Sequence, residues 1–414
     1  MNVFKFGGAS IYNAAAIKNV TAIIQAHRQE KLLVVASAMG ETTNALEQIV
    51  FASRSDNDIR QLVEELRGYH FTILRELFPV NHPVYHEFEM LVVKLQNETT
   101  QPGDDDQVYD QVVSLGEIMS TVILSHYLNL TLVKTHWIDA RGYVKTDSTF
   151  REGKIDWEQT REKIQSLGPL LQHQVVLTQG FIGSDARGLT TTLGREGSDF
   201  SAAIFASCLK ADSVTIWKDV PGVMNADPKR LAQAIVFEEL PFKEAAEMTY
   251  YGASIIHPKT IRPLANSDIP LYVKSFANPE HTGTVIHRCS IGHLPPLIIF
   301  KENQCLISCK VTDYSFITEH QIGIIFQTLS QRNIKINVMQ SSAITFSFCV
   351  DFQASKILKL IEVLSKDFEV YYNTGLTLIT VKNYNQKLFQ EYRNKPGVIL
   401  EQSSRSTLQV LAKS

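Results

Sequence analysis

The chain has 414 residues, of which 44% are hydrophobic and 20% are charged. These values are ordinary for a globular protein, and the length predicts two or three domains, each large enough to bury a core. Forty basic residues stand against 43 acidic ones, and the resulting net charge of −3 argues against a protein that binds nucleic acid or an anionic membrane through a basic surface.

Cysteine usage points to a reducing compartment. The five cysteines are an odd number, and no two are arranged as a CxxC pair; they are Cys208, Cys289, Cys305, Cys309 and Cys349. Cys305 and Cys309 fall in one expected strand, so we expect no metal site there and interpret all five as reduced structural thiols. The chain begins directly on a strand pattern and has no apolar run of membrane-spanning length. We therefore expect a cytoplasmic protein without a signal peptide or membrane partner.

The first stretch predicts a strand, a glycine turn and the start of a helix. Val3 to Phe6 has the strand pattern, and Gly7 and Gly8 follow it directly. Glycine lets the backbone approach a phosphate group closely, and Lys5 can place a positive charge beside it. The spacing matches neither a Walker A loop nor a dinucleotide-binding fingerprint. The alternative is an ordinary strand-to-helix turn with an exposed lysine.

A second strand, at residues 32–36, ends in a loop rich in hydroxyl groups that runs from Ser37 to Asn44. Substrates of open α/β sheets bind at the carboxyl ends of strands, so this loop is a second candidate site segment. Residues 58–97 are strongly helical, and a further single helix is expected at residues 108–128. That helix carries Glu117 among small neighbours, which suggests close approach of a ligand, although a solvated face is the commoner explanation.

The third and most informative stretch is residues 190–202, TTTLGREGSDFSA. It follows a buried-strand pattern at 175–178 and leads into a helix that we expect to open just after Ser198 or Asp199. Free backbone N–H groups and the positive end of the helix dipole make such a loop a natural anion site. The alternative is a plain helix start, with Ser198 and Asp199 as capping residues.

Strand and helix patterns continue to alternate up to residue 287. A strand at 212–217 leads into a loop with turns at 221–222 and 227–228, a helix covers 242–251, and a last strand covers 269–275. This alternation predicts a layered α/β domain, residues 1–287, whose mainly parallel central sheet is covered by helices on both faces.

The C-terminal third has a different rhythm. Gly292, Pro295 and Pro296 mark a linker at residues 288–303. Residues 304–375 then have the ferredoxin-like pattern βαββαβ, with its last strand at 369–372. A new strand at 376–381 starts the same pattern again, and this second copy, residues 376–414, stops after βαββ. We interpret the two copies as an internal repeat with a truncated second unit.

Five motifs, in order along the chain, resemble the amino acid kinase family and, within it, the aspartate kinases. They are Lys5-Phe-Gly-Gly-Ala-Ser10, the loop from Ser37 to Asn44, Gly194-Arg-Glu-Gly-Ser-Asp199, Lys218-Asp-Val-Pro-Gly222 and the segment from Gly252 to Pro258. The two C-terminal copies look like the paired ACT units of the same enzymes. The resemblance implies an amino acid kinase-like α/β sandwich followed by ACT units.

The resemblance also implies roles for particular residues. The catalytic pair would be Lys5 and Asp199. Aspartate would be bound by Ser37, Thr43, Glu117, Arg195 and Ser198. ATP and its phosphates would be bound by Lys5, Gly7, Gly8, Lys218, Asp219, Met224 and Lys229. An effector amino acid would be bound by Ile322, Gly323, Ser341 and Ser342. Four positions differ from the residues typical of the family: Lys218, Met224, Lys229 and Ser254. Mg²⁺ is expected to enter bound to ATP, and no metal site built by protein residues is expected.

The implied reaction is ATP-dependent phosphorylation of the side-chain carboxylate of L-aspartate to 4-phospho-L-aspartate, the first step of lysine, threonine and methionine biosynthesis. A carboxylate of pKa about 4 is already ionised at neutral pH, so this nucleophile needs no general base. We expect a monofunctional enzyme that forms a homodimer or a higher homo-oligomer through residues 304–414. It is expected to be inhibited by lysine, by threonine or by neither. Two alternatives stay open: a catalytically weak amino-acid sensor, or another kinase of the same family.

Overall fold

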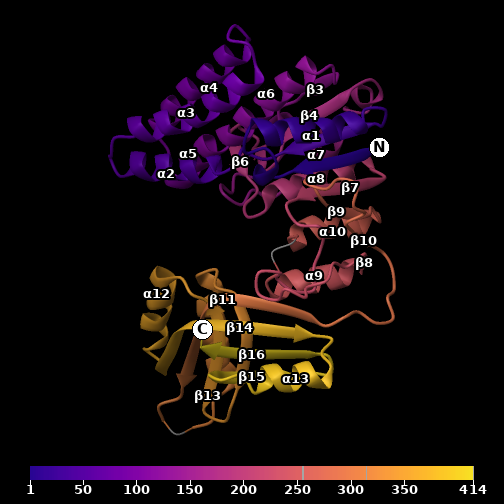
Figure 1. Ribbon diagram of the computed structural model, residues 1–414. Coiled ribbons are helices and arrows are strands. Elements are labelled where there is room, and N and C mark those ends of the chain that lie inside the picture. Colours follow the sequence, from indigo (N-terminus) through magenta and orange to yellow (C-terminus); the bar gives the residue numbers. More distant parts are fainter. Residues whose placement is uncertain (254–255, 314, 414) are drawn as a thin grey trace. The chain divides into compact units, whose positions relative to one another are not determined.

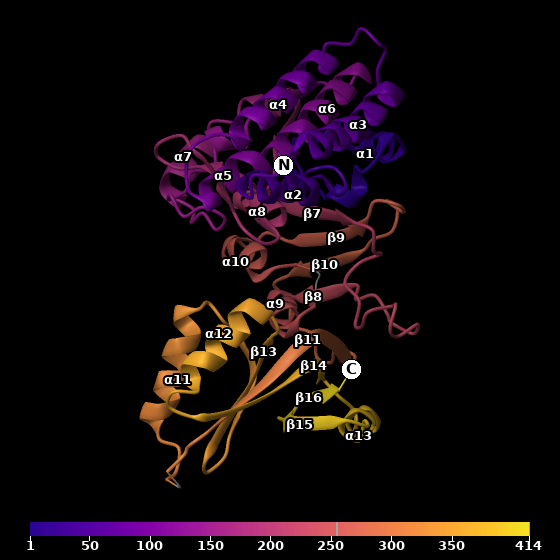
Figure 2. The same cartoon turned by 90° about the vertical axis from the view of Figure 1, so that its left-hand side faces the viewer.

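The computed structural model describes residues 1–253, 256–313 and 315–413, and these form two compact units (Figures 1 and 2). The first unit comprises Met1–Val223, Val236–Ala246 and Ile255–Ile291. The second unit comprises Met224–Ile235, Glu247–Ser254 and Gly292–Ser414. The chain thus passes between the units several times.

The first unit is built on an eight-stranded sheet with the order β3-β4-β2-β1-β7-β9-β10-β8. Every neighbouring pair is parallel except β9 and β10, which confirms the mainly parallel sheet. The strand at 269–275 is not the last, because β10 follows it. The strands are β1 (Asn2–Phe6), β2 (Leu32–Ala36), β3 (Thr135–Trp137), β4 (Val175–Gln179), β7 (Ser213–Lys218), β8 (Glu239–Pro241), β9 (Leu271–Ser275) and β10 (Thr284–His287).

Helices cover the two faces of this sheet, as the sequence predicted. The helices of residues 1–270 are α1 (Ala14–Ala26), α2 (Thr42–Arg54), α3 (Arg60–Leu77), α4 (Val84–Thr99), α5 (Asp105–Val113), α6 (Leu115–Leu130), α7 (Trp157–Gln165), α8 (Gly197–Leu209), α9 (Phe242–Tyr251) and α10 (Pro258–Ser267). Because side chains alternate along a strand, Phe4 and Phe6 of β1 join the core formed with α1 and α6. Lys5 projects to the opposite face, where α8 packs.

Several local predictions were wrong by a few residues. The single helix expected at 108–128 is two helices, α5 and α6, which meet at Ser114. The Ser114 hydroxyl donates to the carbonyl of Gln111, a local bond that competes with helix continuation. Helix α2 begins at Thr42, within the predicted loop, and α8 begins at Gly197, before Ser198. A short hairpin, β5 (Ile182–Ser184) and β6 (Thr190–Thr192), was not predicted.

The second unit contains a six-stranded antiparallel sheet with the order β12-β13-β11-β14-β16-β15. Its strands are β11 (Leu297–Lys310), β12 (Ile336–Ser341), β13 (Thr345–Asp351), β14 (Glu369–Lys382), β15 (Val398–Ser403) and β16 (Thr407–Lys413), and its helices include α11 (Glu319–Gln331), α12 (Ala354–Leu364) and α13 (Gln386–Arg393). The order agrees with two βαββαβ-type halves placed side by side.

Two long strands run through both halves of this sheet. The strands expected at 369–372 and 376–381 form one strand, β14. Strand β11 begins at Leu297, inside the predicted linker of residues 288–303. Its first part, Leu297–Lys301, pairs with the end of β14 and occupies the position of the strand that the truncated second copy lacks.

Candidate active site

A cavity of about 560 Å³ lies in the first unit where polar residues follow strands β1, β2 and β7. The cavity therefore lies at the carboxyl ends of these parallel strands, as expected for this class of sheet. Residues of α6 and α8 also line it. The predicted site residues that line it are Lys5, Gly8, Ser37, Thr43, Glu117, Arg195, Ser198, Asp199 and Lys218. The structure thus gathers residues from motifs that are far apart in the sequence.

Lys5 and Asp199 form a buried ion pair at this cavity. The Lys5 Nζ atom lies 2.7 Å from Asp199 Oδ1, and Lys218 Nζ lies 3.7 Å from Asp199 Oδ2. The side chain of Asp199 is only 5% exposed. Burial by itself raises the pKa of Asp199, but the charges of Lys5 and Lys218 outweigh it and hold the pKa below its ordinary value. Asp199 therefore stays ionised between two cations.

The turn that presents Asp199 depends on close backbone packing. Glu196 precedes α8 with a positive φ of 54°. Gly197 opens the helix, and a Cβ atom there would lie 2.7 Å from Cδ2 of Phe181. Only glycine fits at this position. The turn places Asp199 in the first turn of α8, where the helix dipole also favours a negative charge.

Glu117, in the first turn of α6, is the second buried carboxyl group of the cavity. Burial raises its pKa to about 8, although the backbone N–H groups of Glu117 and Ala38 and the charge of Lys5 act in the opposite direction. Its Oε2 atom is buried without a hydrogen-bond partner among the described residues. A buried acceptor of this kind favours a ligand that brings a cationic donor.

The remaining cavity residues differ in exposure. Arg195 is exposed, while Ser37, Thr43 and Ser198 are half-buried. All four line the cavity, so one guanidinium and three hydroxyl groups surround a space that also contains Glu117. An arginine can hold a carboxylate through two parallel hydrogen bonds, and hydroxyl groups can complete the polar contacts.

The predicted nucleotide residues are less closely grouped. Gly7 lies beside the Lys5 ammonium, since a Cβ atom at Gly7 would be 3.3 Å from Nζ. Asp219 is exposed directly after β7 and does not line the cavity. Met224 and Lys229 belong to the second unit, and Ser254 lies outside the described residues. These nucleotide assignments stay predictions.

His257 lies in the last of the five motif segments, Gly252 to Pro258. This residue is the N-cap of α10, and its Nδ1 atom accepts a hydrogen bond from the backbone N–H of Lys259 at 3.1 Å. His257 therefore caps this helix.

Sequence reasoning missed one wall of the cavity. The missed lining residues include Glu47, Tyr109, Arg151 and Phe181. The Tyr109 hydroxyl donates to Glu47 at 2.5 Å, and the Arg151 guanidinium lies 3.9 Å from the centre of the Tyr109 ring. These residues come from α2, α5 and a loop, and no motif spacing connects them, so only the folded chain could reveal them.

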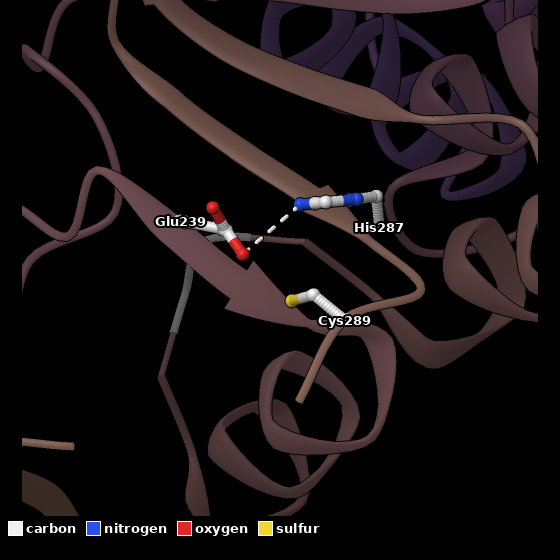
Figure 3. A group of neighbouring side chains, drawn as sticks. All are labelled: Glu239, His287 and Cys289. Carbon is white, nitrogen blue, oxygen red and sulfur yellow. Dashed lines mark ion pairs between the residues drawn. The ribbon is translucent and has the colours of Figure 1, made fainter. Parts of the chain in front are cut away.

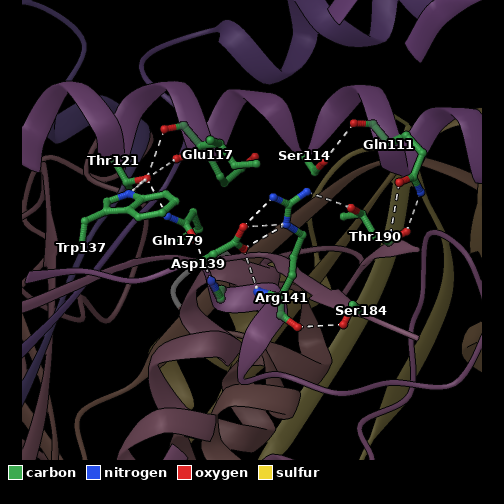
Figure 4. A network of polar contacts seen from close by, with 12 residues as sticks. Gln111, Ser114, Glu117, Thr121, Trp137, Asp139, Arg141, Gln179, Ser184 and Thr190 are labelled. Carbon is green, nitrogen blue, oxygen red and sulfur yellow. Dashed lines mark hydrogen bonds and ion pairs between the residues drawn. The ribbon is translucent and has the colours of Figure 1, made fainter. Parts of the chain in front are cut away.

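A buried polar network supports α6 behind Glu117 (Figure 4). The Thr121 hydroxyl donates to the carbonyl of Glu117 and accepts hydrogen bonds from Trp137 Nε1 at 3.0 Å and from Gln179 Nε2 at 2.8 Å. Gln179 also accepts the backbone N–H of Ala140 at 2.7 Å. The first turn of α6 is thereby fixed to β3 and β4, which holds the backbone of Glu117 in place.

Family membership follows from the extent of the sequence match. The amino acid kinase family matches residues 1–275. The chain belongs to this family. The match covers the residues of all five motifs named above and every residue that lines the cavity.

Relatives with known names extend the match beyond this domain. Lysine-sensitive aspartokinase 3 of Escherichia coli (strain K12) is 33% identical over 362 residues, which are 85% of this chain and 79% of that protein. Aspartokinase 1, chloroplastic, of Arabidopsis thaliana is 31% identical over 363 residues, 84% of this chain and 63% of the relative. The chain spans only 47% of a bifunctional aspartokinase/homoserine dehydrogenase of Buchnera aphidicola, which is 28% identical.

Solved structures agree with the sequence relatives. The crystal structure of E. coli aspartokinase III in complex with aspartate and ADP (R-state) matches with a TM-score of 0.85 and 28% identity, over 100% of this chain and 96% of that chain. The same enzyme in complex with lysine and aspartate (T-state) matches with a TM-score of 0.81 and the same coverage. Together they confirm the predicted architecture, a layered α/β kinase domain followed by ACT units.

Among the described residues, no helix is both long and apolar enough to cross a membrane.

Proposed function

We propose that the protein is an aspartate kinase, which transfers the γ-phosphoryl group of ATP to the side-chain carboxylate of L-aspartate and forms 4-phospho-L-aspartate. The observation that carries this proposal is the division of one cavity into two halves of different chemistry. Glu117 contributes a buried carboxyl oxygen without a hydrogen-bond partner among the described residues, whereas Asp199 is paired with Lys5 and Lys218. The relationship to aspartokinases of E. coli and A. thaliana supports it.

The half of the cavity around Glu117 suits the amino acid substrate. Glu117 would bind the α-ammonium group, whose charge stabilises the ionised form of this carboxyl. Arg195 would hold the α-carboxylate in a bidentate pair, with Ser37, Thr43 and Ser198 as hydroxyl partners. The side-chain carboxylate of the substrate then extends toward Lys5.

The half around Asp199 suits the phosphoryl group. Lys5 would neutralise charge on the transferring group, and the backbone N–H groups at Gly7 and Gly8 would accompany it. Asp199 holds the Lys5 ammonium in position through the 2.7 Å ion pair. ATP complexed with Mg²⁺ is the proposed phosphoryl donor; the ADP complex of the E. coli enzyme supports the nucleotide. Because Asp199 is already paired with two lysines, we expect Mg²⁺ to be held chiefly by the phosphates.

The decisive experiment is a coupled assay of the purified protein with ATP and Mg²⁺. Formation of an acyl phosphate, trapped as the hydroxamate, would be measured with L-aspartate, L-glutamate and N-acetyl-L-glutamate. Aspartate should have the highest kcat/KM. Preference for either other acid would contradict the substrate, and no turnover with any of them would favour the alternative of a catalytically weak sensor.

Regulation is a second proposal, which rests on the ACT-like second unit. Ile322 and Gly323 lie on the first half of α11, and Ser341 and Ser342 lie at the turn between β12 and β13. Both serines are exposed, and Ser342 N donates to Thr345 O at 2.8 Å, which fixes the turn. We propose that this turn and α11 bind an effector amino acid between two copies of the chain in a homodimer formed through residues 304–414.

Lysine is the first candidate effector, supported by the lysine-sensitive E. coli relative, and threonine is the second. Activity would be measured against millimolar lysine, threonine and both together, with sedimentation of the free protein. Inhibition and a higher melting temperature with one amino acid are expected, because an effector stabilises the state that it binds. If the enzyme is fully active with all three additions and its melting temperature is unchanged, the second unit binds no effector and serves only in dimerisation. We further propose a cytoplasmic enzyme.

A further inference from the structure

Three potential metal ligands lie together at one edge of the sheet of the first unit, outside the cavity described above. They are Glu239, His287 and Cys289, and Figure 3 shows their side chains pointing toward one another. One oxygen, one nitrogen and one sulfur atom from these residues all lie within 4.8 Å of one another. The group has no role in the proposed kinase reaction.

The local fold explains why these side chains meet. Strands β8 and β10 are parallel neighbours, with Glu239 opposite Val285 and Pro241 opposite His287. His287 is the last residue of β10, and Cys289 follows two residues later with its side chain directed toward Glu239 (Figure 3). Glu239 reaches them from β8. The residues are separated by 48 positions in the sequence, from 239 to 287, and no CxxC or HxxxH spacing reveals them.

The spacing of the atoms already approaches that of a bound ion. His287 Nε2 lies 3.3 Å from Glu239 Oε1. Two ligand atoms at about 2.1 Å from a tetrahedral zinc ion would lie roughly 3.4 Å apart. The Nε2 atom is buried and makes no geometrically acceptable hydrogen bond within the described part of the chain. The third ligand atom, the Cys289 sulfur, lies within 4.8 Å of both.

We propose that Glu239, His287 and Cys289 bind one divalent transition metal ion of the zinc type and so fasten β8 to β10. Sulfur and imidazole nitrogen select zinc-like ions over Mg²⁺ and Ca²⁺, which prefer oxygen ligands. Three protein ligands leave a fourth position for water. The thiol of Cys289 gives up its proton to solvent when its sulfur binds the ion. This site is independent of the proposed phosphoryl transfer.

Cobalt provides a direct test, because a thiolate bound to Co²⁺ gives a charge-transfer band in the near ultraviolet. The reduced, chelator-treated full-length protein would be titrated with Co²⁺ and then with Zn²⁺. We expect saturation at one equivalent and displacement by Zn²⁺. Cys208, Cys305, Cys309 and Cys349 are buried, whereas Cys289 is partly exposed, so the band should come from Cys289 alone.

Three variants and one control decide the outcome. Cys289→Ser should abolish the near-ultraviolet band, while His287→Ala and Glu239→Gln should weaken Co²⁺ binding at least about tenfold. His281→Ala removes an exposed histidine just before β10 and should change nothing. Zn²⁺ should also raise the melting temperature of the unmodified protein but not that of Cys289→Ser. A band that persists in Cys289→Ser, or Co²⁺ uptake that never saturates, would overturn the proposal.

Discussion

The two walls of the active-site cavity each bury one carboxyl group, and the two groups respond to burial in opposite ways. Glu117 and Asp199 are equally buried, each with 3% of its surface exposed. Burial raises the pKa of Glu117 to about 8, whereas the pKa of Asp199 is lowered. The difference comes from cations: Asp199 lies between two lysines, whereas backbone hydrogen bonds and the charge of Lys5 do not outweigh the effect of burial on Glu117.

The two carboxyl groups therefore differ in how far the protein itself compensates their negative charge. Asp199 already has the charge partners that keep it ionised. Glu117 gains such a partner only when a cationic group enters the cavity. This arrangement of one pre-formed ion pair and one uncompensated acid supports the proposed ligand, which has an ammonium group and an anionic group.

The largest effect is expected from removing the cation that both walls share. Lys5→Met should lower kcat by about a hundredfold to a thousandfold, because a pre-organised contact to the transferring group is lost. It should weaken aspartate binding much less. Steady-state kinetics with each substrate varied would measure both.

Lys218→Met is the matched control for Lys5→Met. Lys218 lies 3.7 Å from Asp199 rather than 2.7 Å, so its loss should cost less activity. Melting temperatures would show whether either variant is merely unfolded. A Lys5→Met enzyme with near-normal kcat would remove Lys5 from the mechanism.

Glu117→Gln tests the other wall through its pH dependence. In the unmodified enzyme the KM for aspartate should fall as pH rises from about 6 to 8, by at most about tenfold per unit, because the ligand ammonium requires ionised Glu117. The Gln variant should show a raised KM without this slope. An unchanged slope would assign the titration to another group.

The same substitution has a consequence for stability. The pKa of Glu117 is raised in the folded protein above its model value of 4.5, so the folded state holds a proton that the unfolded state releases. Stability is therefore lost as pH rises from about 4.5 to 8. Glu117→Gln should raise the melting temperature at pH 9 and leave it nearly unchanged at pH 4, as scanning calorimetry would show.

Arg195→Ala should have an intermediate effect confined to the substrate wall. Loss of hydrogen bonds to a charged group costs about 1.5–3 kcal/mol, so the KM for aspartate should rise roughly tenfold to a hundredfold while that for ATP is nearly constant. Arg195→Lys should recover part of the loss, because a point charge cannot replace the bidentate fork. Equal damage to both KM values would show that Arg195 faces the nucleotide instead.

The smallest effect is expected behind the Glu117 wall. Thr121→Val keeps the side-chain shape but removes the acceptor of Trp137 and Gln179, which should cost about 1–3 kcal/mol of stability and only a few-fold in kcat/KM for aspartate. Thr72→Val is the control, since the Thr72 hydroxyl bonds Gly68 O at an exposed helical position. Equal effects of the two variants on stability, measured by denaturant unfolding, would show that the buried network does not hold α6.

The sequence predicted the strand ends that build the site, because each motif combines a buried strand with local turn chemistry. Lys5, Ser37 and Lys218 were found in this way. The start of α8 was misplaced because its first residue is set by packing of Gly197 against Phe181, a contact between distant segments. Glu47, Tyr109 and Arg151 were missed for the same reason: their proximity depends on how α2 and α5 pack, which local periodicity does not encode.

The fold was predictable where strands and helices alternate. It was less predictable where one long strand belongs to both halves of a sheet. The periodicity of residues 369–381 looks like two strands because the sequence repeat begins again in its middle. Pairing with β11 and β16 keeps β14 continuous instead. The short β8 lies among turns and is only three residues long, so its pattern is too weak to predict.

The continuous strands β11 and β14 make the two repeats of the second unit inseparable in unfolding. Each strand contributes hydrogen bonds to both halves, so opening one half exposes backbone groups of the other. We expect amide hydrogens throughout this sheet to exchange with solvent in a single cooperative event rather than repeat by repeat. If residues 376–414 were removed, the outer end of β14 would be lost with them, and the Leu297–Lys301 part of β11 would lose its partner strand and become an unpaired edge prone to aggregation. Substitutions in either repeat can change that repeat's ligand contacts separately. Because the two repeats share β11 and β14, they must still fold together.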